Sequence, residues 1–174
     1  MFLDVKYKEQ SSKLDKLNLQ ITKIFGRVPP NFELIGNINE NILEDFLSYI
    51  FKLMNHKSIN PDYYAFLRLF IANQEGFEYC KEFNKQLLLS KNYDVEIINE
   101  VKKDISKIPF DDKHKLLANK SIKAIFDSKR FTQSDFDELY NHSWNDKDIL
   151  DSIEHTGFML RNGRILTAYT INWF

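Results

Sequence analysis

The sequence predicts an all-α, single-domain protein. Apolar residues recur at intervals of three and four residues along most of the chain, whereas the alternating pattern of half-buried strands is almost absent. Only 5 Gly and 4 Pro interrupt the 174 residues, so helix breaks are few and can be located individually. A chain of this length is sufficient for one domain with a sizeable core.

The first third of the chain carries clear helix boundaries. A polar N-terminal region includes a possible helix near 13–25, which ends in the turn 25–31 because Pro29 and Pro30 cannot continue a helix. Asn39 is the expected N-cap of a strongly amphipathic helix. The apolar stripe of that helix consists of Ile42, Leu43, Phe46, Leu47, Ile50, Phe51 and Met54.

Two further helices should follow, separated by Gly76. Asn60 before Pro61 combines a capping side chain with a proline suited to the first helical turn, and it predicts a helix through Ile71. The next helix should extend to about Ser90. Its inward-facing residues are predicted to be Phe77, Cys80, Phe83, Leu87 and Leu88.

The second half of the chain repeats the same signals. Asp94 is an expected N-cap, and Pro109 with the acidic pair at 111–112 precedes another helix. The stretch 132–135, Thr-Gln-Ser-Asp, resembles a capping box at the start of a short helix. A last long helix should begin near Asn145, with a possible loosening at Gly163.

Composition excludes several classes of protein. The formal net charge of −1 provides no basic surface for nucleic acid, and no apolar run approaches the ~18 residues of a membrane span. The N-terminus lacks a continuous apolar signal region, so we expect a soluble cytoplasmic protein with neither nucleic acid nor membrane as a partner. Glycine-rich phosphate loops are absent from the sequence, and we expect no cofactor.

The single cysteine and the four histidines bound the possible chemistry. One cysteine cannot form an internal disulfide, and the histidines share no spacing typical of metal ligands, so we expect no metal. Two of the four histidines could approach the cysteine, but only through the fold or from a neighbouring subunit. The histidines are His56, His114, His142 and His155, and the two that could approach the cysteine are His142 and His155.

Cys80 is the candidate catalytic residue. A nucleophilic cysteine reacts as its thiolate, which the start of a helix favours and neighbouring carboxylates such as Glu78 and Glu82 disfavour. Lys81 and Lys85 are the nearby cations, and the helical face of Cys80 contains no base. The alternative is a buried cysteine that acts as a small apolar side chain, and the neighbouring residues favour it.

Two segments together resemble the AhpD-like family, which also contains the carboxymuconolactone decarboxylases. The segment 24–46, with its GRVPPNF turn, resembles the entry to that fold, where a short helix precedes a longer one. The segment 63–90 resembles the signature helix pair, which reads E-L-I-R-L-A-V-A and then C-x-Y-C-x-x-x-H. The resemblance covers roughly 24–172. It implies an AhpD-like helical bundle over 24–174, with 1–23 as an N-terminal extension or helix.

The resemblance also assigns positions in a pocket. The second cysteine of the motif falls on Cys80, and Tyr79 keeps the residue before it. The first cysteine falls on Phe77, the histidine on Asn84 and the glutamate of the preceding helix on Ala65. Without a second sulfur the intramolecular disulfide cycle is impossible, and without the histidine and glutamate the proton relay is missing.

Three functions remain open. A one-cysteine hydroperoxide reductase would form a sulfenic acid on Cys80 and depend on an external thiol reductant. An enzyme that binds a lactone or carboxylate could use the same pocket, with Glu78 as a further candidate in its lining. An oligomeric binding or scaffold protein would need no chemistry at all. The resemblance favours the first and the residues favour the third. The resemblance also implies a homo-oligomer, as a dimer, trimer or hexamer.

Overall fold

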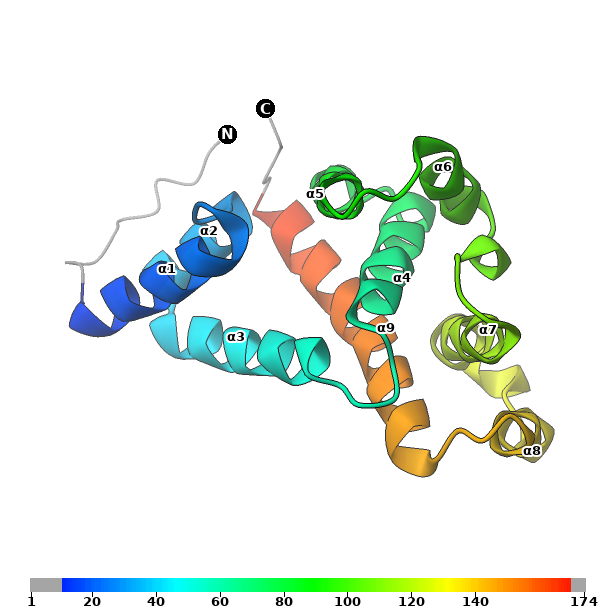
Figure 1. Cartoon of the computed structure of the whole chain (residues 1–174). Helices are drawn as coiled ribbons and strands as arrows, with labels where there is room; N and C mark the ends of the chain where they lie inside the picture. The colour runs from blue at the N-terminus through cyan, green and yellow to red at the C-terminus, as the bar shows by residue number, and fades with distance from the viewer. Residues whose placement is uncertain (1–10, 170–174) are drawn as a thin grey trace. The chain divides into compact units, whose positions relative to one another are not determined.

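The computed structural model describes residues 11–169, and within them every regular element is helical. They form two compact units, the first made of 11–55 together with 168–169 and the second of 56–167. The first contains α1 (Ser12–Phe25), α2 (Pro30–Ile38) and α3 (Glu40–Met54). The second contains α4 (Pro61–Gln74), α5 (Glu78–Ser90), α6 (Val95–Lys103), α7 (Asp112–Phe126), α8 (Gln133–Asn141) and α9 (Asp146–Ala168). The predicted all-α class is therefore confirmed (Figure 1).

The predicted helix boundaries of the first unit are confirmed. The helix expected near 13–25 is α1, and the part of the predicted extension before residue 11 lies outside the described residues. Pro30 is the first residue of α2, because proline is well tolerated at a first helical position. This helix is the short one that the family resemblance implied. The side chain of Asn39 accepts hydrogen bonds from the backbone N–H groups of Asn41 and Ile42, which confirms it as the N-cap of α3.

The apolar stripe predicted for α3 is wider than the face that becomes buried. Leu43 and Leu47 join the core of the first unit, whereas Ile42, Phe51 and Met54 are exposed. Apolar spacing marks the whole stripe, whereas the core of the first unit covers only part of it. The buried core of this unit consists of Leu14, Leu17, Ile21, Phe32, Leu43 and Leu47.

The second unit is built around α4 (Figure 1), and most residues of this helix are buried. Asn60 caps its first turn through the backbone N–H of Asp62, as predicted. Gly76 adopts a left-handed backbone conformation between α4 and α5, with φ of 70°. This conformation suits glycine and allows the sharp reversal that places the start of α5 beside α4.

The last helix, α9, passes through Gly163 without a break, so the predicted loosening there was wrong. The backbone of this glycine lies against the ring of Phe77, and a Cβ atom would collide with that ring. Gly163 therefore makes room for an aromatic side chain. Its role is close packing between α9 and the turn before α5.

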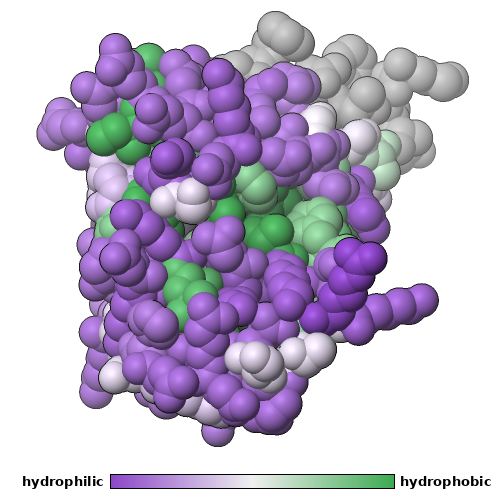
Figure 2. Space-filling view, turned by 90° about the vertical axis from the view of Figure 1, so that its right-hand side faces the viewer, coloured by the Kyte–Doolittle hydropathy of each residue, from purple (hydrophilic) through white to green (hydrophobic). Residues whose placement is uncertain are grey.

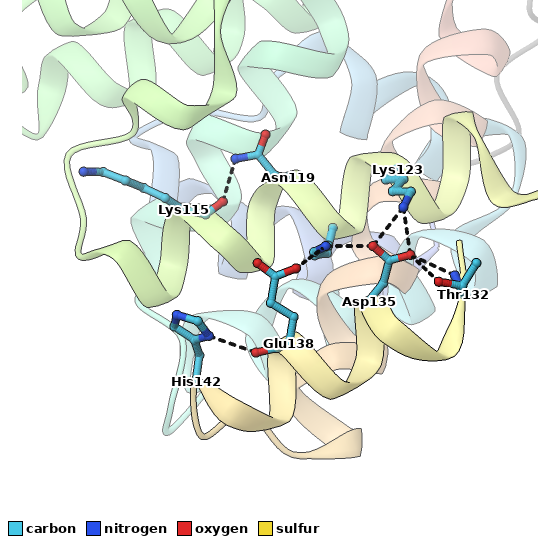
Figure 3. A network of polar contacts seen from close by, with 8 residues as sticks. Lys115, Asn119, Lys123, Thr132, Asp135, Glu138 and His142 are labelled. Atoms are coloured by element: carbon cyan, nitrogen blue, oxygen red, sulfur yellow. Dashed lines mark hydrogen bonds and ion pairs between the residues drawn. The ribbon is translucent and has the colours of Figure 1, made fainter. Parts of the chain in front are cut away.

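The capping box at the start of α8 is present and belongs to a larger polar network (Figure 3). The carboxylate of Asp135 accepts a hydrogen bond from the backbone N–H of Thr132, at 2.8 Å. It also forms ion pairs with Lys120 and Lys123 of α7, at 2.7 and 2.8 Å. The two lysines, followed by the Thr132 backbone, hold the pKa of this carboxyl well below its usual range.

We expect Asp135→Asn to lower the free energy of unfolding at pH 7 by about 1–2 kcal/mol, because two charge-assisted contacts are lost while a capping oxygen remains. A carboxylate with a depressed pKa stabilises the fold above its unfolded pKa of about 3.9, and this contribution is lost as the pH falls through its folded pKa. Urea unfolding should show a smaller difference in the free energy of unfolding between the wild type and Asp135→Asn below pH 4 than at pH 7. Asp137→Asn, at an exposed position of the same helix, is the control. Equal effects of the two variants at pH 7 would contradict the prediction.

Candidate functional site

Cys80 lies in the first turn of α5 and is 7% exposed. Phe77 and Tyr79, which flank it, are also buried. The charged neighbours in sequence pair with each other at the surface. Lys81 contacts Glu78 at 2.5 Å. One turn further along the helix, Lys85 contacts Glu82 at 3.7 Å. These four charges therefore form neighbouring ion pairs, and the cation that acts on the sulfur comes from another helix.

That cation is Arg68 of α4. Its Nε donates a hydrogen bond to Oδ1 of Asn84 at 2.7 Å, and the amide nitrogen of Asn84 donates to the backbone oxygen of Cys80 at 2.8 Å. The other side of the guanidinium meets Nε2 of His155 on α9, at 3.2 Å. Residues from α4, α5 and α9 thus form one continuous polar chain beside the thiol.

The same chain fixes the state of His155. The ring is fully buried, with the ring of Tyr64 packed edge-on against it at 4.9 Å, and it forms a hydrogen bond with the backbone of Tyr64. Burial, followed by the charge of Arg68, lowers the pKa of His155 well below its usual value. The ring is therefore neutral, and because an arginine can only donate, Nε2 is the acceptor of that contact. The lone pair that a general base would need is already engaged.

Burial also dominates the state of the thiol. It raises the pKa of Cys80 to about 11, and the positive charge of Arg68 opposes this shift without cancelling it. A thiol with this pKa is protonated at neutral pH, and a protonated thiol is a poor nucleophile. The site therefore contains the parts of a thiol centre but holds the sulfur in its unreactive form.

All of the residues that the resemblance placed in the pocket are buried in the second unit. Ala65 lies on α4, one turn before Arg68, and Phe77 packs on Gly163. Asn84 is one of the links in the polar chain. That these positions form a ligand pocket remains a prediction.

Sequence reasoning missed Arg68. The signal was present, because a lone arginine inside the apolar run YYAFLRLFIA is half-buried by necessity, and buried arginines are rare unless they have partners. His155 was recognised only as a residue that the fold could bring near Cys80. It reaches the site through Arg68, whereas His142 is exposed and contacts the backbone oxygen of Glu138.

Metal-binding clusters and membrane-spanning helices were sought in the part of the chain that the structure describes. Across residues 11–169 no group of three or more His, Cys, Asp or Glu side chains is arranged to hold a metal ion. Over the same residues, no helix is long and apolar enough to cross a bilayer.

The fold itself has known counterparts. The chain resembles the crystal structure of an uncharacterized peroxidase-related protein from Silicibacter sp. TM1040, with a TM-score of 0.85 and 18% identity, over 98% of this chain and 90% of that one. It also resembles the alkylhydroperoxidase AhpD core of an uncharacterized peroxidase-related protein from Ralstonia eutropha JMP134, with a TM-score of 0.78 and 16% identity, over 97% and 87%. The sequence matches no protein-family model, and no curated protein is similar to it in sequence. The predicted AhpD-like fold is thereby confirmed.

Proposed function

We propose that this chain is an AhpD-like protein that does not turn over hydroperoxides and serves as an oligomeric binding or scaffold protein. The observation that carries the proposal is the burial of Cys80, which raises the pKa of the thiol to about 11 and so favours its protonated form at neutral pH. The engagement of His155 by Arg68 supports it, because the histidine in the site has no lone pair available for the thiol proton.

The scaffold function requires surface for a partner. Apolar residues gather in the middle of a largely hydrophilic face on the side of α6, α7 and α8 (Figure 2). Among the exposed apolar side chains of these helices are Val95, Phe126 and Tyr140. As part of the proposal, such side chains bury against a second copy of the chain to form the homo-oligomer that the resemblance implies.

A second candidate is a one-cysteine hydroperoxide reductase, and the position of Arg68 favours it. A guanidinium beside a sulfur stabilises the thiolate, which would attack the peroxide oxygen, form an S–O bond and release the alkoxide as the O–O bond breaks. Two equivalents of an external thiol would then reduce the sulfenic acid and leave as a disulfide with water. For this function, the lowering of the Cys80 pKa by Arg68 would have to outweigh the raising of that pKa by burial.

The rate of sulfenic acid formation separates the two candidates. At pH 7, about one Cys80 in 10⁴ is ionised, against a few per cent of free cysteine. Even with the greater nucleophilicity of a more basic thiolate, we expect Cys80 to react with hydrogen peroxide and with an organic hydroperoxide about tenfold or more slowly than free cysteine. Cys80→Ser gives the background. A rate above that of free cysteine would establish the reductase instead.

A further inference from the structure

A hollow opens between α1 and α3, which lie side by side in the first compact unit (Figure 1). Its volume is about 530 Å³, which is within the usual range for small-molecule sites. The side chains that line it come from 12–20 of α1 and 44–51 of α3, so all of them belong to the first unit. None of them belongs to the surroundings of Cys80 or to the apolar face of α6, α7 and α8.

Part of the lining of this hollow is apolar. Leu17 of α1 and Leu47 of α3 are buried core residues of the unit, and their side chains form the floor. Phe51, one turn after Leu47, also lines the hollow and is 36% exposed. Covering an aromatic ring and two leucines with an apolar group removes their surface from water, which is favourable. The hollow therefore offers a surface for the apolar part of a ligand.

The charged side chains of the lining leave one positive charge uncompensated. Lys13 contacts Glu44 at 2.6 Å, so this ion pair joins the two helices and neutralises the carboxylate. Lys16, one turn further along α1, is exposed and has neither an ion pair nor a hydrogen bond with the residues of 11–169. Ser12 and Gln20, the residues four positions before and after it, carry no charge, so no carboxylate of α1 shares its face.

These features determine which ligand fits. A lysine lays its methylene groups along apolar surface and keeps its ammonium group at the rim in water. There it attracts an anion as a point charge, without the planar fork through which arginine forms two parallel hydrogen bonds. A cation would be repelled by the same ammonium group, and a multiply charged anion would find only one uncompensated partner. The hollow therefore suits one carboxylate group attached to an apolar body.

We propose that the hollow between α1 and α3 is a binding site for monocarboxylates with an apolar body. The apolar body packs on Leu17 and Leu47 and against the ring of Phe51. The carboxylate accepts a hydrogen bond from the ammonium group of Lys16 and neutralises its charge. Binding involves no reaction and is independent of Cys80.

The test is an NMR titration of the full-length protein with 4-phenylbutyrate, 4-phenylbutanol and 4-phenylbutylammonium, which share an apolar body and differ in charge. We expect the carboxylate to bind with a dissociation constant of about 1 mM or below and to shift the methyl signals of Leu17 and Leu47. The alcohol should bind about fivefold more weakly, because it lacks the attraction to Lys16, and the cation should bind more weakly still.

Two variants locate the site. Lys16→Gln should weaken binding of the carboxylate about fivefold and leave binding of the alcohol unchanged. Lys23→Gln, at an exposed position of the same helix outside the hollow, is the matched control and should change neither. Ser48→Trp places a large side chain in the hollow from an exposed position of α3 and should abolish binding of both compounds.

Three outcomes would overturn the proposal. The first is a titration in which the methyl signals of Leu17 and Leu47 do not shift. The second is a carboxylate that binds no more tightly than the alcohol and the cation. The third is an equal effect of Lys16→Gln and Lys23→Gln on binding of the carboxylate, which would show that the attraction does not come from the hollow.

Discussion

Gly163→Ala should destabilise the protein by about 2–3 kcal/mol, although alanine is the better helix former. The added Cβ would occupy the space of the Phe77 ring, which is buried and cannot move away as the end of a flexible side chain could. Chemical denaturation followed by circular dichroism measures the effect. An unchanged midpoint would contradict the close packing of α9 on this ring.

Gly157 on the same helix provides the control. A Cβ there meets only the side chain of Ile125, at an ordinary 3.5 Å, so Gly157→Ala should be neutral or stabilise by up to about 1 kcal/mol. Phe77→Ala removes the collision and leaves a cavity, so it should be less harmful in the Gly163→Ala background than in the wild type. Strict additivity of the two substitutions would show that Phe77 and Gly163 do not pack against each other.

Arg68→Met should cost about 3 kcal/mol. The substitution keeps a long apolar stem but leaves Oδ1 of Asn84 and Nε2 of His155 without their donor, and each buried acceptor without a partner costs about 1–3 kcal/mol. Arg68→Lys keeps the charge but cannot reach both acceptors in the fixed fork of a guanidinium, so an intermediate loss is expected.

Arg130→Met is the matched control for this prediction. Arg130 is exposed and pairs only loosely with Asp127, at 3.6 Å, and surface pairs of this kind contribute less than about 1 kcal/mol. If Arg68→Met were no more destabilising than Arg130→Met, the polar chain between α4, α5 and α9 would not contribute to the stability of the fold.

Local signals predicted most of the fold. Asn39, Asn60 and Asp94 are N-caps in the structure as expected, because a cap depends on a side chain and the backbone two or three residues later. The loosening predicted at Gly163 was wrong because the role of this glycine depends on a distant residue. A glycine that weakens a helix and one that admits a distant ring look the same in sequence, and the ring of Phe77 belongs to a different part of the chain.

The candidate site was predictable only in part. Cys80 and Asn84 lie one helical turn apart, so the sequence placed them together and showed that neither is a base. The link to His155 through Arg68 joins three helices, and no spacing rule could have revealed it. The raised pKa of Cys80 likewise depends on tertiary burial, which outweighs the nearby charges that sequence reasoning considered.

The pH dependence of Cys80 alkylation tests the central claim, that this AhpD-like fold holds its thiol protonated. With iodoacetamide in excess, the rate should rise steadily from pH 7, reach half of its maximum near pH 11, the pKa to which burial raises the thiol, and form a plateau only above that pH. Arg68→Met should slow alkylation at every pH below that plateau, because the guanidinium is the charge that favours the thiolate. A wild-type midpoint below about pH 8.5, the pKa of an ordinary cysteine, would contradict the claim and establish an activated thiol.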